Sequence, residues 1–255
     1  MSENGPIDYR QWAYLSPGAV FLLVHGLGAH AGRWDFLVDF FATRGFISYA
    51  ADLRDFRDYY NKIARLRGSA AKDNPGKPIF LIGESFGAIV SLLTASREPD
   101  LFNGLICISP AFANRVRPAP IEQLKIAASL FYNPNKQFKL PFDSSMCTRD
   151  TDYIKKMDED SREYRTVSSR SILDILLAQA RSRGLKDIKP PVLFLLAGED
   201  KLVDPAAARK IFNGLEVKDK TLIEFPGMYH SLSIELGKEK VFVEMLKWVE
   251  QRIAT

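Results

Sequence analysis

The chain has few of the residues that mark several large protein classes. It contains only two cysteines, Cys107 and Cys147, in 255 residues. Disulfide scaffolds and zinc centres need more cysteines at closer spacing, so two unpaired thiols and no metal site are expected. No apolar run approaches the roughly 20 residues that span a bilayer, and no charged-then-apolar leader opens the chain. These absences predict a cytoplasmic protein.

Charge of either sign is also modest. The chain has 35 lysines and arginines against 31 aspartates and glutamates, a net charge of +4. The basic residues are spread among acidic ones, which is typical of a solvated surface and does not indicate a nucleic-acid partner, although a weak attraction to anionic lipid is compatible with it. A hydrophobic content of 46% is enough for one large core.

Strand-like runs alternate with helical patterns along the chain. The apolar, β-rich runs are Val20–Val24, Phe46–Ala50, Ile79–Ile82, Leu105–Ile108, Val192–Leu196 and Thr221–Phe225. Helical spacing of apolar residues occupies Trp34–Arg44, Phe86–Ser96, Ala206–Leu215 and Lys238–Arg252. This alternation predicts an α/β fold, with a mainly parallel sheet and helices on both of its faces.

A Gly-x-Ser-x-Gly pentapeptide, Gly83 to Gly87, joins the third of these runs to the helical pattern that follows it. A strand-to-helix turn this tight leaves almost no room for side chains beside the serine, so Gly83 and Gly87 fit where larger residues would clash. The unpaired amides at the start of the helix favour developing negative charge. The pattern predicts that Ser85 is a nucleophile.

A serine hydroxyl needs a histidine to take its proton and a carboxylate to orient that histidine. The chain has three histidines: His25, His30 and His230. His230 follows the run Thr221–Phe225, and the ends of parallel strands are where open α/β sheets hold their chemistry. We therefore predict that His230 is the base. His25 and His30 are expected to shape an earlier glycine-rich turn through hydrogen bonds.

The acid is expected after another strand, where three carboxylates follow a continuous apolar run. Asp204 precedes Pro205 and a helical pattern, which favours an N-cap role. Glu199 and Asp200 are neighbours in an extended turn, so they point to opposite sides and only one can face the histidine. Spacing alone does not distinguish them.

The oxyanion of the reaction needs two backbone amides aimed at it. Phe86, directly after the serine, is predicted to supply one of them. The other is assigned to Leu27, which lies between Gly26 and Gly28 in the turn after Val20–Val24. A phosphate-binding loop is excluded at this turn, because neither Gly-Lys-Ser/Thr nor a complete Gly-x-Gly-x-x-Gly follows. No cofactor is predicted.

The region from 112 to 187 stands between two sheet strands and is longer than an ordinary crossover. We predict that it is an inserted helical cap on a core formed by residues 1–111 and 188–255. Its amphipathic segment is Ile121–Tyr132, and its densely charged middle, Arg149–Arg165, is expected to be solvated. The apolar cap residues either pack on the sheet or line a slot for an acyl chain, in which each buried methylene contributes roughly 0.8 kcal/mol.

Four segments together resemble the α/β-hydrolase family of monoacylglycerol lipases and lysophospholipases. They are His25 to Trp34, Gly83 to Gly87, Gly198 to Val203 and Gly227 to His230. The resemblance covers the chain from Tyr14 onward and is weakest in the middle. It implies that Asp200 is the acid of the triad and that Leu27, after His-Gly, supplies the second oxyanion amide.

The resemblance also implies a serine carboxylic-ester hydrolase that works through an acyl-enzyme and needs no cofactor. Its expected partner is a small ester with a fatty acyl chain, such as a monoacylglycerol or a lysophospholipid, and the cap is expected to touch a membrane surface transiently. Fold and triad do not fix the acyl group, so a thioesterase, an aryl esterase and a peptidase remain alternatives. A binding protein with a silent triad is a further one.

The chain departs from the family in one place. The family usually continues from its Asp-x-x triplet into a Gly-His-Gly-x-Ser loop, whereas here Asp52-Leu53-Arg54 passes directly to Asp55. Either the loop has been lost or a stretch is left out of the numbered sequence. Loops of two to six residues commonly join strands to helices, so the connection can close. The departure affects the pocket wall near Arg54 and not the triad.

Overall fold

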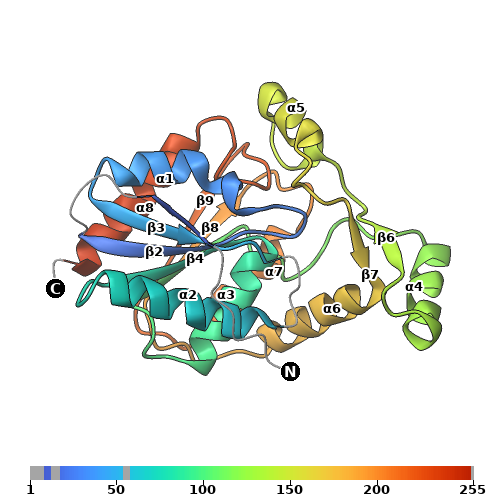
Figure 1. Ribbon diagram of the computed structural model, residues 1–255, viewed down its shortest axis with the longest axis horizontal. Coiled ribbons are helices and arrows are strands. Elements are labelled where there is room, and N and C mark those ends of the chain that lie inside the picture. Colours follow the sequence, from blue (N-terminus) through green and yellow to red (C-terminus); the bar gives the residue numbers. More distant parts are fainter. Residues whose placement is uncertain (1–8, 13–17, 54–57, 254–255) are drawn as a thin grey trace.

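A seven-stranded sheet forms the centre of the protein (Figure 1). The computed structural model describes residues 9–12, 18–53 and 58–253. In chain order the strands are β1 Arg10–Trp12, β2 Ala19–Val24, β3 Phe46–Ala50, β4 Ile79–Glu84, β5 Gly104–Ile108, β8 Val192–Ala197 and β9 Lys220–Phe225. Their order across the sheet is β1-β3-β2-β4-β5-β8-β9, and all neighbours are parallel except β1 and β3.

Helices cover both faces of this sheet. α1 (Asp35–Ala42) and α8 (Lys238–Ile253) pack on one face, and α2 (Tyr59–Asp73), α3 (Phe86–Arg97) and α7 (Pro205–Gly214) pack on the other. The central strands are therefore buried on both sides, which is why they are continuous apolar runs without alternation. The α/β-hydrolase fold expected from the sequence is confirmed.

The short edge strand β1 was not predicted. It has three residues with no apolar run, and it pairs antiparallel with β3. The shortened connection after Leu53 lies at residues 54–57, outside the described part of the chain.

The segment between β5 and β8 extends away from the sheet. Its elements are α4 Pro120–Tyr132, β6 Gln137–Lys139, α5 Thr151–Glu159, β7 Thr166–Ser168 and α6 Ser169–Arg183. Helices dominate it, and β6 and β7 add a separate two-stranded antiparallel sheet. α6 lies against α3, whereas α4 and α5 project outward in Figure 1. No helix among the described residues is long and apolar enough to cross a membrane.

The charged stretch Arg149–Arg165 is less solvated than predicted. Tyr153 and Met157 lie four residues apart on α5, so they share one face of the helix, and both are buried. The Glu163 side chain is 3% exposed because it pairs with the buried Arg33. A dense run of charges thus still supplies groups that fix the cap to the core.

Candidate active site

Ser85 lies in the tight turn that the pentapeptide predicts. Its φ is 58° and its ψ is −120°, between the end of β4 and the start of α3. A Cβ on Gly83 would come within 2.4 Å of the Gly87 carbonyl oxygen, and a Cβ on Gly87 within 2.1 Å of the Val24 oxygen. The close approach of three backbone segments therefore requires both glycines.

Asp200 and His230 are joined by a hydrogen bond. His230 Nδ1 lies 2.7 Å from Asp200 Oδ2, and both side chains are buried. The other oxygen of Asp200 accepts from the amides of Leu202 and Val203, at 2.8 and 2.9 Å. Glu199 is exposed, so the geometry agrees with the resemblance in placing Asp200 toward the histidine.

The surroundings of His230 favour its protonated form. Burial alone would lower the pKa of His230, but the charge and hydrogen bond of Asp200, together with the charge of Glu84, raise it above the ordinary value. An imidazole in this setting holds a transferred proton firmly, which suits a general base that must later act as an acid.

Ser85 and His230 line the same cavity, which has a volume of about 120 Å³. Leu27 and Phe86, the residues predicted to supply oxyanion amides, line it as well. No direct hydrogen bond joins the Ser85 hydroxyl to His230 among the described residues. In unliganded sites this contact is often long and tightens only when substrate binds.

The turn that carries Leu27 is fixed by His25, as predicted. His25 Nδ1 lies 2.8 Å from the Gly26 carbonyl, and Nε2 accepts from the Leu53 amide at 2.9 Å. Burial lowers the pKa of His25, so the ring is neutral and its two nitrogens act as donor and acceptor. Gly28 completes the turn with a φ of +86°.

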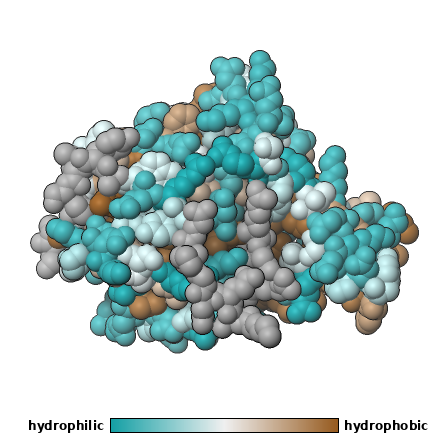
Figure 2. Space-filling view, viewed as in Figure 1, coloured by the Kyte–Doolittle hydropathy of each residue, from teal (hydrophilic) through white to brown (hydrophobic). Residues whose placement is uncertain are grey.

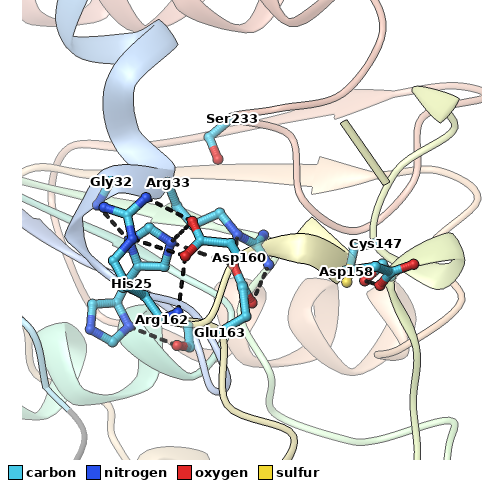
Figure 3. Close-up of polar contacts among 12 residues, drawn as sticks. His25, Gly32, Arg33, Cys147, Asp158, Asp160, Arg162, Glu163 and Ser233 are labelled. Carbon is cyan, nitrogen blue, oxygen red and sulfur yellow. Dashed lines mark hydrogen bonds and ion pairs between the residues drawn. The ribbon is translucent and has the colours of Figure 1, made fainter. Parts of the chain in front are cut away.

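A polar cluster beside the cavity connects the cap to the core (Figure 3). The guanidinium of Arg33 faces the carboxylate of Glu163, with Nη2 2.9 Å from Oε2 and Nε bonded to Oε1. His30 accepts from the Gly32 amide and holds its Nε2 3.2 Å from Asp160. Arg33 also lines the cavity, so this ion pair fixes a side chain of its wall.

Sequence reasoning did not single out Arg33, Glu84 or Cys147 as cavity residues, yet all three line the cavity. Arg33 stands inside a segment that was recognised, but its buried partner Glu163 is 130 positions away. No local pattern marks such a pair.

A second cavity, of about 500 Å³, adjoins the first inside the cap. The two share wall residues, including Leu27, Val116, Leu140 and Ile175. Apolar side chains of α4 and α6 contribute to its lining, namely Ile126, Ala127, Leu130, Ile172, Leu173, Ile175 and Leu176. The reactive end of the site thus continues into a mainly apolar space.

The thiols and carboxylates do not form a metal site in the described part of the chain. Cys107 and Cys147 are buried and unpaired. Burial raises the pKa of Cys147 to about 11, so this cavity-lining thiol is not a thiolate at neutral pH.

A protein-family model described as serine aminopeptidase, S33 (Hydrolase_4) matches residues 16–237. The chain belongs to this α/β-hydrolase family. It is 30% identical to human monoglyceride lipase over 94% of this chain and 85% of that protein. It is 27% identical to phospholipase YtpA of Bacillus subtilis, over 95% of this chain and 99% of that one.

Structural comparison agrees with this assignment. The crystal structure of Paleococcus ferrophilus monoacylglycerol lipase superposes with a TM-score of 0.82 and 25% identity, over 96% of this chain and 99% of that one. Family, relatives and fold show that the protein is an enzyme, a serine ester hydrolase of the α/β-hydrolase fold. The predicted family and enzyme class are confirmed.

Proposed function

We propose that Ser85, His230 and Asp200 form the catalytic triad of a lipase that cleaves fatty acyl monoesters. Ser85 attacks the ester carbonyl while His230 takes its proton, and the amides of Leu27 and Phe86 bind the oxyanion. His230 then protonates the leaving alcohol, and a water molecule activated by the same ring releases the acid. The observation that carries this proposal is the Asp200–His230 hydrogen bond on the wall of the cavity that Ser85 lines.

The apolar cavity inside the cap supports a fatty acyl chain as the acid part of the substrate. It adjoins the reactive cavity and has room for many methylenes, each of which contributes roughly 0.8 kcal/mol when buried. The named activities of the relatives favour a monoacylglycerol. Aryl esters of short acids and peptides do not need an apolar space of this size, whereas a fatty acyl thioester would fill it as a fatty acyl ester does.

A lysophospholipid is the second candidate substrate. Three exposed cations, Arg117, Lys139 and Arg183, line the cap cavity beside its apolar wall. They offer charge complementarity to a phosphate group. One of the relatives is a phospholipase by name.

A fluorophosphonate probe tests whether Ser85 is the nucleophile. We expect labelling of the natural protein and none of Ser85→Ala, while Asp200→Asn is labelled far more slowly and turns over ester about 10⁴-fold more slowly, because the histidine loses its correct tautomer. The substitution Ser91→Ala, on the same α3 helix, is the control and is expected to be labelled normally. Equal labelling of Ser85→Ala and the natural protein would refute the assignment.

Glyceryl monoesters and lysophospholipids of graded chain length test the acyl pocket on the same preparations. Leu173→Trp fills the cap cavity and is expected to shift the preferred chain to shorter acids. Leu177→Trp is the matched control, since Leu177 lies four residues later on α6 and is exposed outside the cavity. An unchanged chain-length profile in Leu173→Trp would place the acyl chain elsewhere.

The boundaries of the cap and its contact with lipid are part of the same proposal. We assign residues 112–187 to the cap. The α4 side chains Ile121, Leu124, Phe131 and Tyr132 are 61, 67, 92 and 65% exposed. Figure 2 shows apolar side chains gathered at the end of the molecule that α4 forms. Two exposed cations lie beside them, since Lys125 is on α4 and the Lys136 ammonium lies 5.8 Å from the centre of the Tyr132 ring. Exposed apolar groups beside cations suit the surface of an anionic membrane.

We further propose that the protein works in the cytoplasm. Two buried, unpaired thiols support this location, because cysteines stay reduced there. Cell fractionation tests it, and recovery of the protein outside the cytoplasm would contradict it.

A further inference from the structure

Glu84 is a buried carboxylate that the triad does not use. It is the last residue of β4, directly before Ser85, and it is 6% exposed on the wall of the reactive cavity. Both of its oxygens bind one residue. Oε1 accepts from the Ser233 amide at 3.1 Å, and Oε2 accepts from the Ser233 hydroxyl at 3.0 Å.

Ser233 lies three residues after His230, so Glu84 joins the strand that ends at the nucleophile to the loop that carries the base. The same loop is fixed to the cap on another side. The Ser231 amide donates to the Cys147 carbonyl at 2.8 Å, and Glu235 of this loop accepts from the Arg149 amide at 3.2 Å. The Glu84–Ser233 pair is therefore a direct link between the serine turn and the histidine loop.

The charges around this link act on the histidine. Asp200 and Glu84 both raise the pKa of His230, and Arg33 opposes them. The pKa of Glu84 itself is raised by burial, against the hydrogen bonds from Ser233 and the charges of His230 and Arg33. Arg33 is matched by Glu163. The remaining titratable groups that feel the charge of Glu84 are Cys147 and Tyr153.

We propose that Glu84 is a positioning residue of the reaction, which sets the place of His230 relative to Ser85 and supplies a second negative charge for the imidazolium. The proposal rests on the proposed triad and adds a residue to it. When His230 takes the proton of Ser85, a positive charge forms in a buried site, where a nearby carboxylate interacts strongly with it. Asp200 meets this charge through its hydrogen bond to Nδ1, and Glu84 lines the same cavity as His230.

Glu84→Gln tests the charge, because it keeps the shape and removes the ionisation. Since Glu84 raises the pKa of His230, its loss is expected to move the acid limb of the kcat/KM profile to lower pH by roughly one unit. The value of kcat is expected to fall roughly ten-fold with KM little changed. Glu84→Asp, which keeps the charge, is expected to restore the position of the acid limb. A purely structural role would leave the acid limb where it is.

Glu199→Gln is the matched control. It removes the same charge beside another triad residue, but Glu199 is exposed, so its pH profile is expected to follow that of the natural protein. Ser233→Ala keeps the carboxylate and deletes one hydrogen bond, and it provides a test if Glu84→Gln does not fold. We expect Ser233→Ala to lower kcat several-fold with KM unchanged.

The outcomes separate this proposal from the proposed function. If the natural protein cleaves esters and Glu84→Gln shows an unchanged acid limb, Glu84 has no electrostatic part in the reaction. Full kcat in Ser233→Ala would show that the link does not position His230. If the natural protein fails to turn over any ester, the proposed function itself is wrong.

Discussion

At the scale of single residues, the backbone conformation of Ser85 depends on the lack of side chains at Gly83 and Gly87. The backbone of Ser85 has a positive φ, and the chain passes so close to β2 that residue 87 has no space for a methyl group. The backbone geometry at Ser85, the proposed nucleophile, therefore depends on the absence of side chains at Gly83 and Gly87. The preceding residue, Glu84, can carry a long side chain, because that side chain extends to Ser233 in the histidine loop.

Gly87→Ala is expected to lower the free energy of unfolding by roughly 3 kcal/mol or more, since its Cβ would overlap the Val24 carbonyl oxygen. Urea denaturation measures this loss. Gly68→Ala is the control, because Gly68 lies in α2 with no atom within 4 Å of the added Cβ. That change is expected to stabilise by about 0.5–1 kcal/mol. Equal effects of the two substitutions would show that the turn tolerates a side chain.

Local motifs were enough to predict Ser85 and His230 as site residues, because a glycine-flanked turn and a loop after a strand leave local signals. Asp200 and Glu199 were not separated by spacing, since the choice depends on where a distant loop brings the imidazole. The Glu84–Ser233 contact spans 149 positions. No short sequence pattern predicts this contact, because Glu84 and Ser233 become neighbours only when the sheet folds.

At the scale of elements, the long strands and most core helices were predictable because each buries an apolar run or stripe. The helix α2 was not predicted, because it buries only Ile63, Leu66 and Ala70 among many polar residues. β1, β6 and β7 have three residues each, which is too short for a periodic signal. The amphipathic character of α5 was hidden among its charges. It became visible only when Tyr153 and Met157 were found buried on one face.

The pair between Arg33, in the 3₁₀ helix Ala31–Trp34, and Glu163 of the cap joins two elements far apart in sequence. Glu163→Gln leaves a buried guanidinium without its counter-charge, so we expect the free energy of unfolding to fall by about 3 kcal/mol. The double substitution Arg33→Met with Glu163→Leu removes both charges and is expected to recover most of this loss. Thermal and urea denaturation compare the three proteins.

The matched control for this pair is Glu224→Gln. Glu224 pairs with Arg209 on an exposed surface, where an ion pair contributes roughly 1 kcal/mol or less. If Glu163→Gln and Glu224→Gln have the same small effect, the buried pair does not hold the cap to the core.

At the scale of the whole molecule, exposed apolar side chains gather on α4, with Lys125 and Lys136 beside them. A net charge of +4 is therefore a poor guide to what the surface can bind, because it averages over regions of different character. The spread of basic residues along the sequence predicted an ordinary solvated face, and it gave no sign of this exposed apolar group.

Sedimentation with vesicles tests this surface. We expect binding to vesicles rich in phosphatidylserine and weaker binding to neutral ones, with the difference lost at high salt. Leu124→Ser with Phe131→Ser is expected to weaken binding by about 2 kcal/mol or more. Val243→Ser, an exposed apolar residue on α8, is the control and is expected to bind normally. Equal binding by both variants would place the lipid contact away from α4.

The wall of the cap cavity comes from one unbroken stretch of chain, apart from Leu27. The proposed triad residues Ser85, Asp200 and His230 all come from outside that stretch. Replacing the whole segment between β5 and β8 with that of a relative would therefore change the proposed acyl pocket and leave the proposed triad in place. The preference for an acyl chain and the chemistry of ester cleavage can therefore evolve independently in this protein.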